Sequence, residues 1–334
     1  MDQKASILSG EDRLIDRFFR PLVKDAGALG LFDDAACITP PAGHDIVLTV
    51  DASIAGVHFF ADDPADLVAK KSLRVNLSDL AAKGARPLGA LLSLSIPETV
   101  SEDWLAAFSH GLGADLDQFG CPLLGGDTTR TTGGTTISIT AIGTVPRGSM
   151  VKRSGARPGE HVVVTGTLGD SSLGLELRKR PDAPGFAQLG DDEKAHLAER
   201  YLLPQPRLAL ADALREAATA AIDISDGLVG DLAKLASASG VAAHIEAKSV
   251  PLSPAARVVL AGAPERLETV LTGGDDYEIA AAVPENRLAA LKEAAKEAGV
   301  MVTTIGRIET GDSVTVRGPN GQPLTLKRAS FSHF

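Results

Sequence analysis

The sequence predicts a mixed α/β protein with two domains, on three observations. Its 334 residues are enough for two domains of ordinary size. Short apolar runs of strand length alternate with longer segments whose apolar residues recur at helical spacing, which indicates helices covering sheets. The segment 147–158 (RGSMVKRSGARP) is small, basic and broken by glycine and proline. We therefore predict an N-terminal domain over 1–148 and a C-terminal domain over 149–334.

The composition is that of a globular protein and limits its partners. Apolar residues make up 44%, charged residues 23%, and the formal net charge is −10. The sequence lacks the basic clusters of a nucleic-acid surface, and no run of 18 apolar residues predicts a membrane span. The N-terminus lacks the apolar core of a signal peptide. Cys37 and Cys121 stand far apart without a CxxC motif, so we expect two buried thiols, no zinc site and a cytoplasmic location.

The N-terminal half is expected to hold one sheet covered by helices. Its predicted helix over 63–84 opens at Asp63-Pro64, an N-cap followed by proline at the first helical position. A polar row on that helix (Ser72, Asn76, Asp79 and Lys83) is either a solvated face or a functional one. The other predicted elements are a helix over 11–20, a turn and strand over 31–38, strands over 46–50, 88–96 and 135–145, and a helix over 101–120.

The C-terminal half predicts a second sheet. A glycine-rich turn over 166–172 opens a helix, and it is either an anion site or a plain connection. Asn320-Gly321 predicts a hairpin between 314–317 and 323–326. The other predicted elements are strands over 161–165, 220–224, 241–246, 277–283 and 302–308, a surface loop over 181–195, and helices over 208–218 and 227–240.

The stretch 123–130 (LLGGDTTR) combines glycine, a carboxylate and hydroxyls after an apolar run, which predicts a tight turn. Glycine permits positive φ and a close approach of another group. Asp127 suits a hard cation, or it caps the next segment. Carboxylates recur at other element ends, which favours a metal site assembled from distant parts of the chain. These are Asp33, Asp34, Asp51, Asp79, Asp223, Asp226, Asp275 and Asp276.

Several carboxylates in one pocket raise one another's pKa unless a cation neutralises them. Mg²⁺ is usually bound by a few carboxylates together with substrate phosphates and water, which is the arrangement of phosphoryl transfer. The dipeptide Gly-Lys never occurs, so there is no Walker A loop, and HRD and HExxH are absent as well. An ATP enzyme with this sequence is therefore expected to hold ATP through metal ions.

Eight motifs, in this order along the chain, resemble those of the thiamine-monophosphate kinases, within the aminoimidazole ribonucleotide synthetase-like superfamily. The resemblance extends from about residue 14 to residue 334 and implies that superfamily's two-domain fold. It implies an N-terminal sheet with helices on one face and a C-terminal α/β domain. The motifs are FDDAACI (32–38), VDASIAGVHF (50–59), NLSDLAAKGARP (76–87), GGDTTR (125–130), KRSGARPGE (152–160), VTGTLGDSS (164–172), AIDISDGL (221–228) and LTGGDDYE (271–278).

The resemblance implies ATP-dependent phosphorylation of thiamine monophosphate to thiamine diphosphate, the last step of thiamine diphosphate biosynthesis, by in-line transfer assisted by several Mg²⁺ ions. It also implies a homodimer built on the N-terminal sheets and an active site between the domains. The implied metal ligands are Asp34, Thr49, Asp51, Asp79, Asp127, Asp223 and Asp226, with Asp51, Asp79 and Asp127 catalytic. The implied nucleotide contacts are Gly126, Asp127, Arg153 and Ser225, and the implied thiamine contacts are His58, Asp275 and Phe331.

Three positions depart from the family pattern. Phe32 stands where glycine is usual, Val50 where threonine is usual, and Asp275 where glutamate is common.

Simpler interpretations also remain for several residues. Asp33 and Asp276 would cap turns, His58 would be a structural histidine, Phe331 would pack in the core, and Arg153 would be an exposed junction residue. Two other functions stay open as well. One is a sister ATP enzyme acting on another phosphate or carboxylate, and the other is a non-catalytic sensor of thiamine phosphates.

Overall fold

The structure is a computed structural model that describes residues 9–328 and Ser330. The chain forms two units, which we describe separately. The N-terminal unit comprises Met1–Leu80 and Arg86–Gly148, and the C-terminal unit comprises Ala81–Ala85 and Ser149–Phe334. None of the helices in the described ranges is long and apolar enough to cross a membrane.

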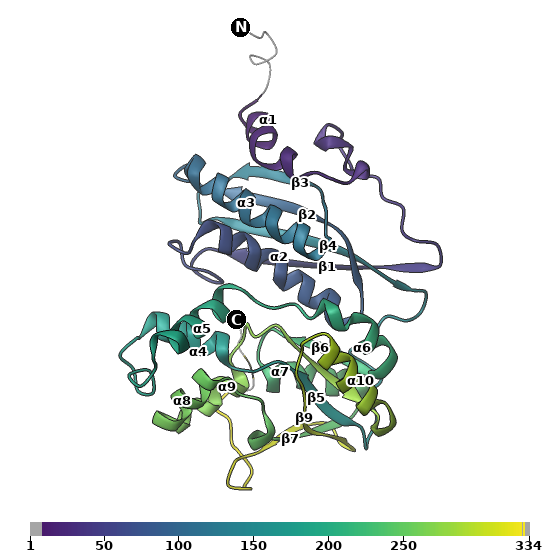
Figure 1. Cartoon of the computed structure of the whole chain (residues 1–334), viewed down its shortest axis with the longest axis vertical. Coiled ribbons are helices and arrows are strands. Elements are labelled where there is room, and N and C mark those ends of the chain that lie inside the picture. The colour runs from purple at the N-terminus through teal and green to yellow at the C-terminus, as the bar shows by residue number, and fades with distance from the viewer. Residues whose placement is uncertain (1–8, 329, 331–334) are drawn as a thin grey trace. The chain divides into compact units, whose positions relative to one another are not determined.

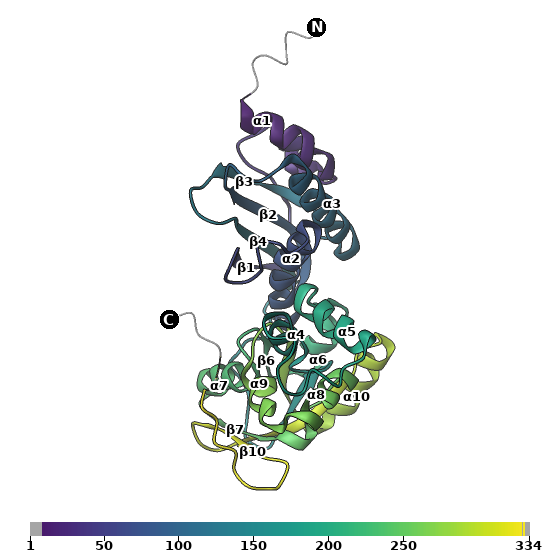
Figure 2. The ribbon, with the colours of Figure 1, turned by 90° about the vertical axis from the view of Figure 1, so that its left-hand side faces the viewer.

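The N-terminal unit is built on a four-stranded sheet with the strand order β1-β4-β2-β3. Strand β4 lies antiparallel to both β1 and β2, whereas β2 and β3 are parallel. Two long helices cover one face of this sheet, as expected (Figures 1 and 2). The elements are β1 (His44–Ile54), α2 (Ala65–Ala82), β2 (Arg86–Ile96), α3 (Glu102–Phe119), β3 (Leu123–Arg130) and β4 (Thr136–Pro146).

The two faces of this sheet differ because side chains alternate along each strand. Apolar side chains such as Leu94 and Ile137 are fully buried beneath the helices. On the opposite face, which we call the open face, Ile46, Leu48 and Val50 of β1 are 47%, 66% and 60% exposed. The open face therefore carries an apolar strip along the edge strand β1.

The segment before β1 is only partly as predicted. The helix expected over 11–20 is present as α1 (Gly10–Leu14), η2 (Ile15–Phe19) and η3 (Arg20–Leu22). The strand expected near 31–38 is wrong. The short helix η4 (Ala26–Leu31) ends with positive φ at Leu29 and Leu31, and the amide of Cys37 bonds back to the Gly27 carbonyl instead of to a strand.

The tight turn predicted at 125–129 (GGDTT) is also wrong, because residues 123–130 form β3. Glycine is disfavoured in strands, which is why the pattern indicated a turn. Here glycine is required by a close approach of two backbones. A Cβ atom on Gly126 would lie 1.7 Å from the Leu92 carbonyl oxygen of β2, whereas one on Gly125 would meet only the Leu91 side chain at 3.5 Å.

The C-terminal unit contains a six-stranded sheet with the order β10-β7-β9-β5-β8-β6. Its strand pairs are antiparallel except for β10 with β7. The expected strands are confirmed, but the return of the predicted hairpin makes only an isolated bridge, between Arg317 and Pro323. The strands are β5 (His161–Thr165), β6 (Ala220–Ile224), β7 (Ala242–Glu246), β8 (Glu278–Val283), β9 (Val302–Glu309) and β10 (Val314–Arg317).

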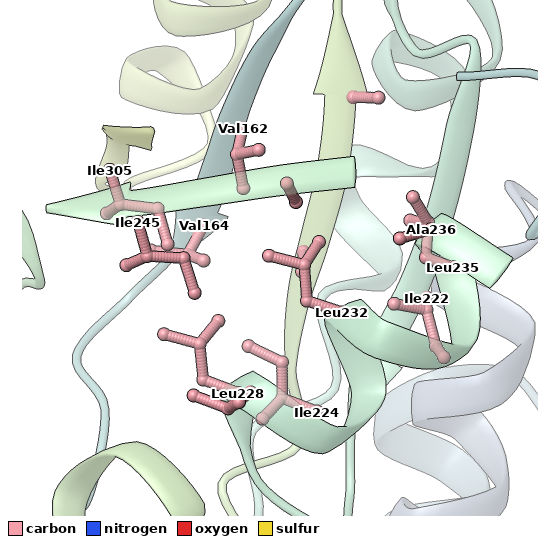
Figure 3. Close-up of a cluster of buried hydrophobic side chains, with 14 of the residues drawn as sticks. Val162, Val164, Ile222, Ile224, Leu228, Leu232, Leu235, Ala236, Ile245 and Ile305 are labelled. Atoms are coloured by element: carbon pink, nitrogen blue, oxygen red, sulfur yellow. The ribbon is translucent and has the colours of Figure 1, made fainter. Parts of the chain in front are cut away.

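Both faces of this sheet are buried, so its central strands are almost entirely apolar. On one face Val162 and Val164 of β5 pack with Leu232 of α7 (Leu228–Ser239), as Figure 3 shows. On the other face Val163 packs with α6 (Ala211–Ala217) and α10 (Glu285–Glu297). The end of α2 joins this second core through Ala81 and Ala82.

A third core lies among helices α4 (Asp170–Lys179), α5 (Asp191–Leu202), α8 (Pro254–Gly262) and α9 (Leu267–Thr272). The fully buried Phe186 packs there. The surface loop predicted over 181–195 is therefore wrong in two respects: Phe186 is buried in this core, and the residues from Asp191 onward belong to α5.

Candidate functional site

A cavity of about 680 Å³ lies on the open face of the N-terminal sheet, beneath the segment that precedes β1. Asp33 and Asp34 line it from that segment, and Gly126 and Asp127 line it from β3. The structure thus brings together carboxylates that are about ninety residues apart in the sequence. We call this group the cavity carboxylates (Asp33, Asp34 and Asp127).

The floor of the cavity includes polar side chains that the sequence analysis missed. In the strand register Ser93 of β2 pairs with Asp127 on one side and with Ser138 of β4 on the other. These residues and Thr140 line the cavity as well. The signal was the alternation of leucine and serine over 92–95, which places every second side chain on the open face.

Two other predicted metal ligands meet between β1 and α2. The Thr49 hydroxyl donates a hydrogen bond of 2.5 Å to the Asp79 carboxylate. Two residues further along β1, the Asp51 amide donates a hydrogen bond to the Asn76 side chain at 2.9 Å. Asn76 and Ser72 are buried, at 0% and 3% exposure, so the solvated-face interpretation of the polar row on α2 is wrong for them.

Strand alternation separates these groups within the N-terminal unit. Thr49 and Asp51 share the parity of the buried Val47, on the helix-covered side of β1. Asp127 shares a row with Ser93 and Ser138 on the open face. Within this unit the predicted ligands therefore form two groups on opposite sides of the sheet.

His58 has a structural role in the turn after β1. Its ring Nδ1 accepts a hydrogen bond from the Ile54 amide at 3.1 Å, and its carbonyl accepts one from Lys71 at 3.2 Å. The structural interpretation is therefore supported, and the contact with thiamine stays a prediction.

The structure shows the surroundings of two residues that depart from the family pattern, Phe32 and Val50. Phe32 is 78% exposed, and the Arg20 guanidinium lies 3.8 Å from the centre of its ring. Val50 projects on the open face of β1, opposite in parity to Asp51.

In the C-terminal unit the structure brings together Ser225, Asp226 and Asp275. The Asp275 amide donates to the Ser225 carbonyl at 2.8 Å. The loop after β6 is held in turn by Asp231 of α7, whose carboxylate accepts from the amides of Ser225 and Asp226 at 3.0 and 2.8 Å. Asp231 is almost fully buried, and burial raises the pKa of its carboxyl.

Asp226 lies in an ion pair, which bears on its predicted role as a metal ligand. The Lys234 ammonium is 2.6 Å from Asp226 and 2.8 Å from Asp231. Burial by itself would lower the pKa of Lys234, but the hydrogen bonds to the two carboxylates outweigh this and raise it. A metal ion at Asp226 would therefore compete with a bound ammonium group.

The remaining predicted residues are more scattered. Arg153 is exposed, and its carbonyl bonds to Ser239 at the end of α7, whereas Ser225 bonds to Asp231 in the first turn. At 1.5 Å per helical residue these two ends are roughly 12 Å apart, so the two hydrogen bonds hold the backbones of Arg153 and Ser225 at opposite ends of α7. Asp223 is buried on β6, and Phe331 lies outside the described residues.

The two cysteines do not behave alike. Cys37 is exposed, contrary to expectation, because the strand predicted to bury it does not form. Cys121 is buried as expected, and burial raises the pKa of its thiol to about 12.

The donors at these positions suit Mg²⁺ in their chemistry, since they are carboxylate and hydroxyl oxygens. Within residues 9–328 there is no group of three or more His, Cys, Asp or Glu residues placed to hold a metal ion. Mg²⁺ commonly takes only one or two protein carboxylates and completes its shell with phosphates and water. The pair Asp34 and Asp127 and the pair Thr49 and Asp79 therefore each fit a Mg²⁺ ion that binds together with a phosphate ligand.

Comparison with known proteins defines the class of this chain. Residues 32–145 match the N-terminal domain of AIR synthase related proteins, and residues 157–318 match the C-terminal domain of the same proteins. The chain is therefore an AIR synthase related protein.

Full-length relatives narrow the assignment. A thiamine-monophosphate kinase of Caulobacter vibrioides is 42% identical over 325 residues, covering 96% of this chain and 89% of that protein. The crystal structure of thiamine-monophosphate kinase from Stenotrophomonas maltophilia shares 41% identity with a TM-score of 0.83, covering 94% of this chain and 98% of its own. A structure described as AaThiL complexed with AMPPCP and TMP shares 31% identity with a TM-score of 0.77, covering 100% and 99%. The chain belongs to the thiamine-monophosphate kinase family.

Proposed function

We propose that this protein transfers the γ-phosphoryl group of ATP to the phosphate of thiamine monophosphate, giving ADP and thiamine diphosphate. The observation that carries this proposal is the similarity, over the whole chain, to a structure with AMPPCP and TMP bound. AMPPCP is an analogue of ATP, and in this family TMP denotes thiamine monophosphate. The eight sequence motifs that resemble those of the family also lie in the family's order along this chain.

The chemistry needs little from side chains beyond position and charge. An oxygen of the acceptor phosphate is already anionic, so it attacks the γ-phosphorus without a strong general base. The bond from the γ-phosphorus to the β-phosphate oxygen breaks as the new anhydride bond forms, and ADP leaves with the bonding electrons. The protein must therefore hold two polyanions in line and reduce their mutual repulsion.

We further propose that Mg²⁺ ions bind at two places, one held by Asp34 and Asp127 at the cavity and the other by Asp51, Asp79 and Thr49 beside α2. Bound Mg²⁺ would neutralise phosphate charge and polarise the phosphoryl oxygens. In this proposal Thr49 fixes the orientation of the Asp79 carboxylate through their hydrogen bond. Asn76 fixes the backbone at Asp51 in the same way.

The other assignments remain part of the proposal. Gly126, Arg153 and Ser225 contact the nucleotide, Asp223 and Asp226 bind further metal ions, and His58, Asp275 and Phe331 contact thiamine. The protein would act in the cytoplasm as a homodimer. The dimer is supported by the apolar strip Ile46, Leu48 and Val50 on the open face of β1, which a monomer would leave in water.

The direct test incubates the purified chain with ATP, Mg²⁺ and thiamine monophosphate, and separates the thiamine esters by chromatography. We expect thiamine diphosphate and ADP in equal amounts, and neither when a chelator replaces Mg²⁺. Unphosphorylated thiamine serves as the control acceptor. ADP formed only with a different phosphate or carboxylate would indicate a sister ATP enzyme. Binding of thiamine monophosphate without turnover would indicate a sensor.

Dependence on the metal can be measured without turnover. Titration calorimetry should show ATP binding with Mg²⁺ present and its loss in chelator. Equally tight binding of ATP in the absence of any divalent ion would exclude the proposed role of the carboxylates.

A further inference from the structure

The loop 273–277, which joins α9 to β8, has an unusual backbone. Asp275 and Tyr277 have φ angles of 71° and 49°, in the left-handed region that favours glycine. Positive φ is uncommon for such side chains, and a bulky residue adopts it only where the surrounding structure holds it. Something must therefore fix this loop on both sides of Asp276.

Asp276 is the buried residue between these two. It is 1% exposed, and both of its carboxylate oxygens accept from the Gly169 amide, at 2.8 and 3.0 Å. Gly169 precedes α4 in the glycine-rich turn after β5. The carboxylate thus joins two loops that are more than a hundred residues apart in the sequence.

The loop is also packed tightly against the end of β6. The amides of Asp275 and Tyr277 donate to the carbonyls of Ser225 and Ile224, each at 2.8 Å. A Cβ atom on Gly274 would lie 2.5 Å from the Ser225 carbonyl oxygen, so the two backbones touch. The position of Asp275 relative to Ser225 therefore depends on how closely this loop is held.

A buried ionic cluster fixes the far side of the loop. Glu278, fully buried at the start of β8, bonds to Arg200 at 2.9 Å, to Arg207, and to the Thr165 hydroxyl at 2.6 Å. Glu278 and its arginines hold the end of the loop, and Arg200 also donates to the Asp276 carbonyl at 3.4 Å. The Asp276 carboxylate is the side chain of the loop that bonds to the Gly169 turn.

We propose that Asp276 is a positioning residue, whose buried carboxylate holds Asp275 in the left-handed conformation that presents it to thiamine monophosphate. This inference rests on the proposed function, in which Asp275 contacts that substrate. Asp276 itself touches no substrate. It acts by binding the Gly169 amide and so fixing the backbone on either side.

Hydrogen exchange tests the positioning without any activity. In Asp276→Ala the amides of Asp275 and Tyr277 should exchange at least about tenfold faster, because the loop that carries them is no longer held against the Ser225 and Ile224 carbonyls. Glu160→Ala is the matched control, since Glu160 is 7% exposed and accepts from the Arg157 amide at 2.9 Å before β5 begins. Equal protection of the two loop amides in wild type and Asp276→Ala would overturn the proposal.

Steady-state kinetics test the consequence. Asp276→Ala should raise the KM for thiamine monophosphate about tenfold while the KM for ATP stays within about twofold. Asp276→Asn should stay near wild type, because its amide oxygen can still accept from Gly169. In an Asp275→Ala background, Asp276→Ala should add less than about twofold, since a residue that acts through Asp275 has nothing left to position.

The outcomes separate this inference from the proposed function. Wild type that forms no thiamine diphosphate would refute the function, while the exchange experiment still decides the role of Asp276. Active wild type with equal KM changes for both substrates, additive effects in the double variant, or an Asp276→Ala no different from Glu160→Ala would refute the positioning role. Should Asp276→Ala not fold, Asp276→Leu replaces it, since leucine branches at Cγ as aspartate does, fills the space that alanine leaves empty and still lacks the acceptor.

Discussion

The contact between Gly126 and Leu92 allows a sharp test of the candidate site, because the adjacent glycine provides a matched control. In Gly126→Ala the new methyl carbon would lie 1.7 Å from the Leu92 carbonyl oxygen and 2.7 Å from its carbon. Both of these atoms belong to the backbone, so no side-chain rotation relieves the overlap. The alternative is that β3 moves away from β2.

The required movement can be estimated from the contact distance. Ordinary contact for a Cβ atom begins at 3.4 Å, so β3 must shift by more than about 1 Å. Strand hydrogen bonds break when they are stretched that far. Because β3 is the edge strand next to β2, it can separate locally while the rest of the sheet stays folded. Asp127 would move with it, and misplacing a reacting group by about 1 Å costs roughly 10²-fold in rate.

We therefore expect Gly126→Ala to lose about 10²-fold in kcat/KM and to be destabilised by about 1–3 kcal/mol. The assay combines thiamine diphosphate formation with thermal unfolding. Gly125→Ala should change little, since its methyl group meets only the Leu91 side chain at 3.5 Å. Equal behaviour of the two variants would show that close approach of the strands does not govern the site.

Three further predictions concern charge, pH and assembly. Asp127→Asn should lower kcat roughly 10²–10³-fold, by analogy with removing a charge-stabilising group. Its melting temperature without ligands should hold or rise, because repulsion among the cavity carboxylates falls. Full activity of this variant would mean that the cavity carboxylates are structural. Burial raises the pKa of Asp276 well above 3.8, so the folded state holds this proton more tightly than the unfolded state, and its contribution to stability is lost as pH rises from 3.8 through the raised value. Asp276→Asn should accordingly gain in melting temperature relative to wild type as pH rises across that range, and a difference that stays constant with pH would contradict this. Leu48→Glu should convert a dimer into a monomer in analytical ultracentrifugation. Val57→Glu, on a similarly exposed residue outside β1, should not, and a Leu48→Glu variant that stays dimeric would place the interface elsewhere.

Local sequence was sufficient for most helices and strands of this protein. Periodicity and caps correctly placed α3, whose first turn is capped by Ser101 and which ends at Gly120 in the left-handed conformation. The apolar strands β5 and β6 were equally clear, because a strand buried on both faces reads as an unbroken apolar run. Their signals depend on neighbouring residues alone.

Other features were decided by contacts between distant segments. Gly125 and Gly126 look like a turn in sequence, and only the presence of β2 shows that one of them is needed for strand contact. The residues before β1 look like a strand, but they have no strand partner and bond locally instead. A strand requires a neighbour, and the sequence does not state which segment that will be.

The same division holds for the candidate site. The sequence by itself predicted which residues would carry the chemistry, since Asp34, Asp79 and Asp127 stand in a set of motifs whose order along the chain resembles that of the family. Only the tertiary structure decided that Asp127 shares a cavity with Asp34, while Asp79 bonds to Thr49 on the other side of the sheet. It also decided that Asp276, which looks like an ordinary turn carboxylate, is buried against Gly169. The physical reason is that burial and pairing are properties of the folded chain, fixed by sheet register and by segments far away in sequence, whereas residue type is fixed locally.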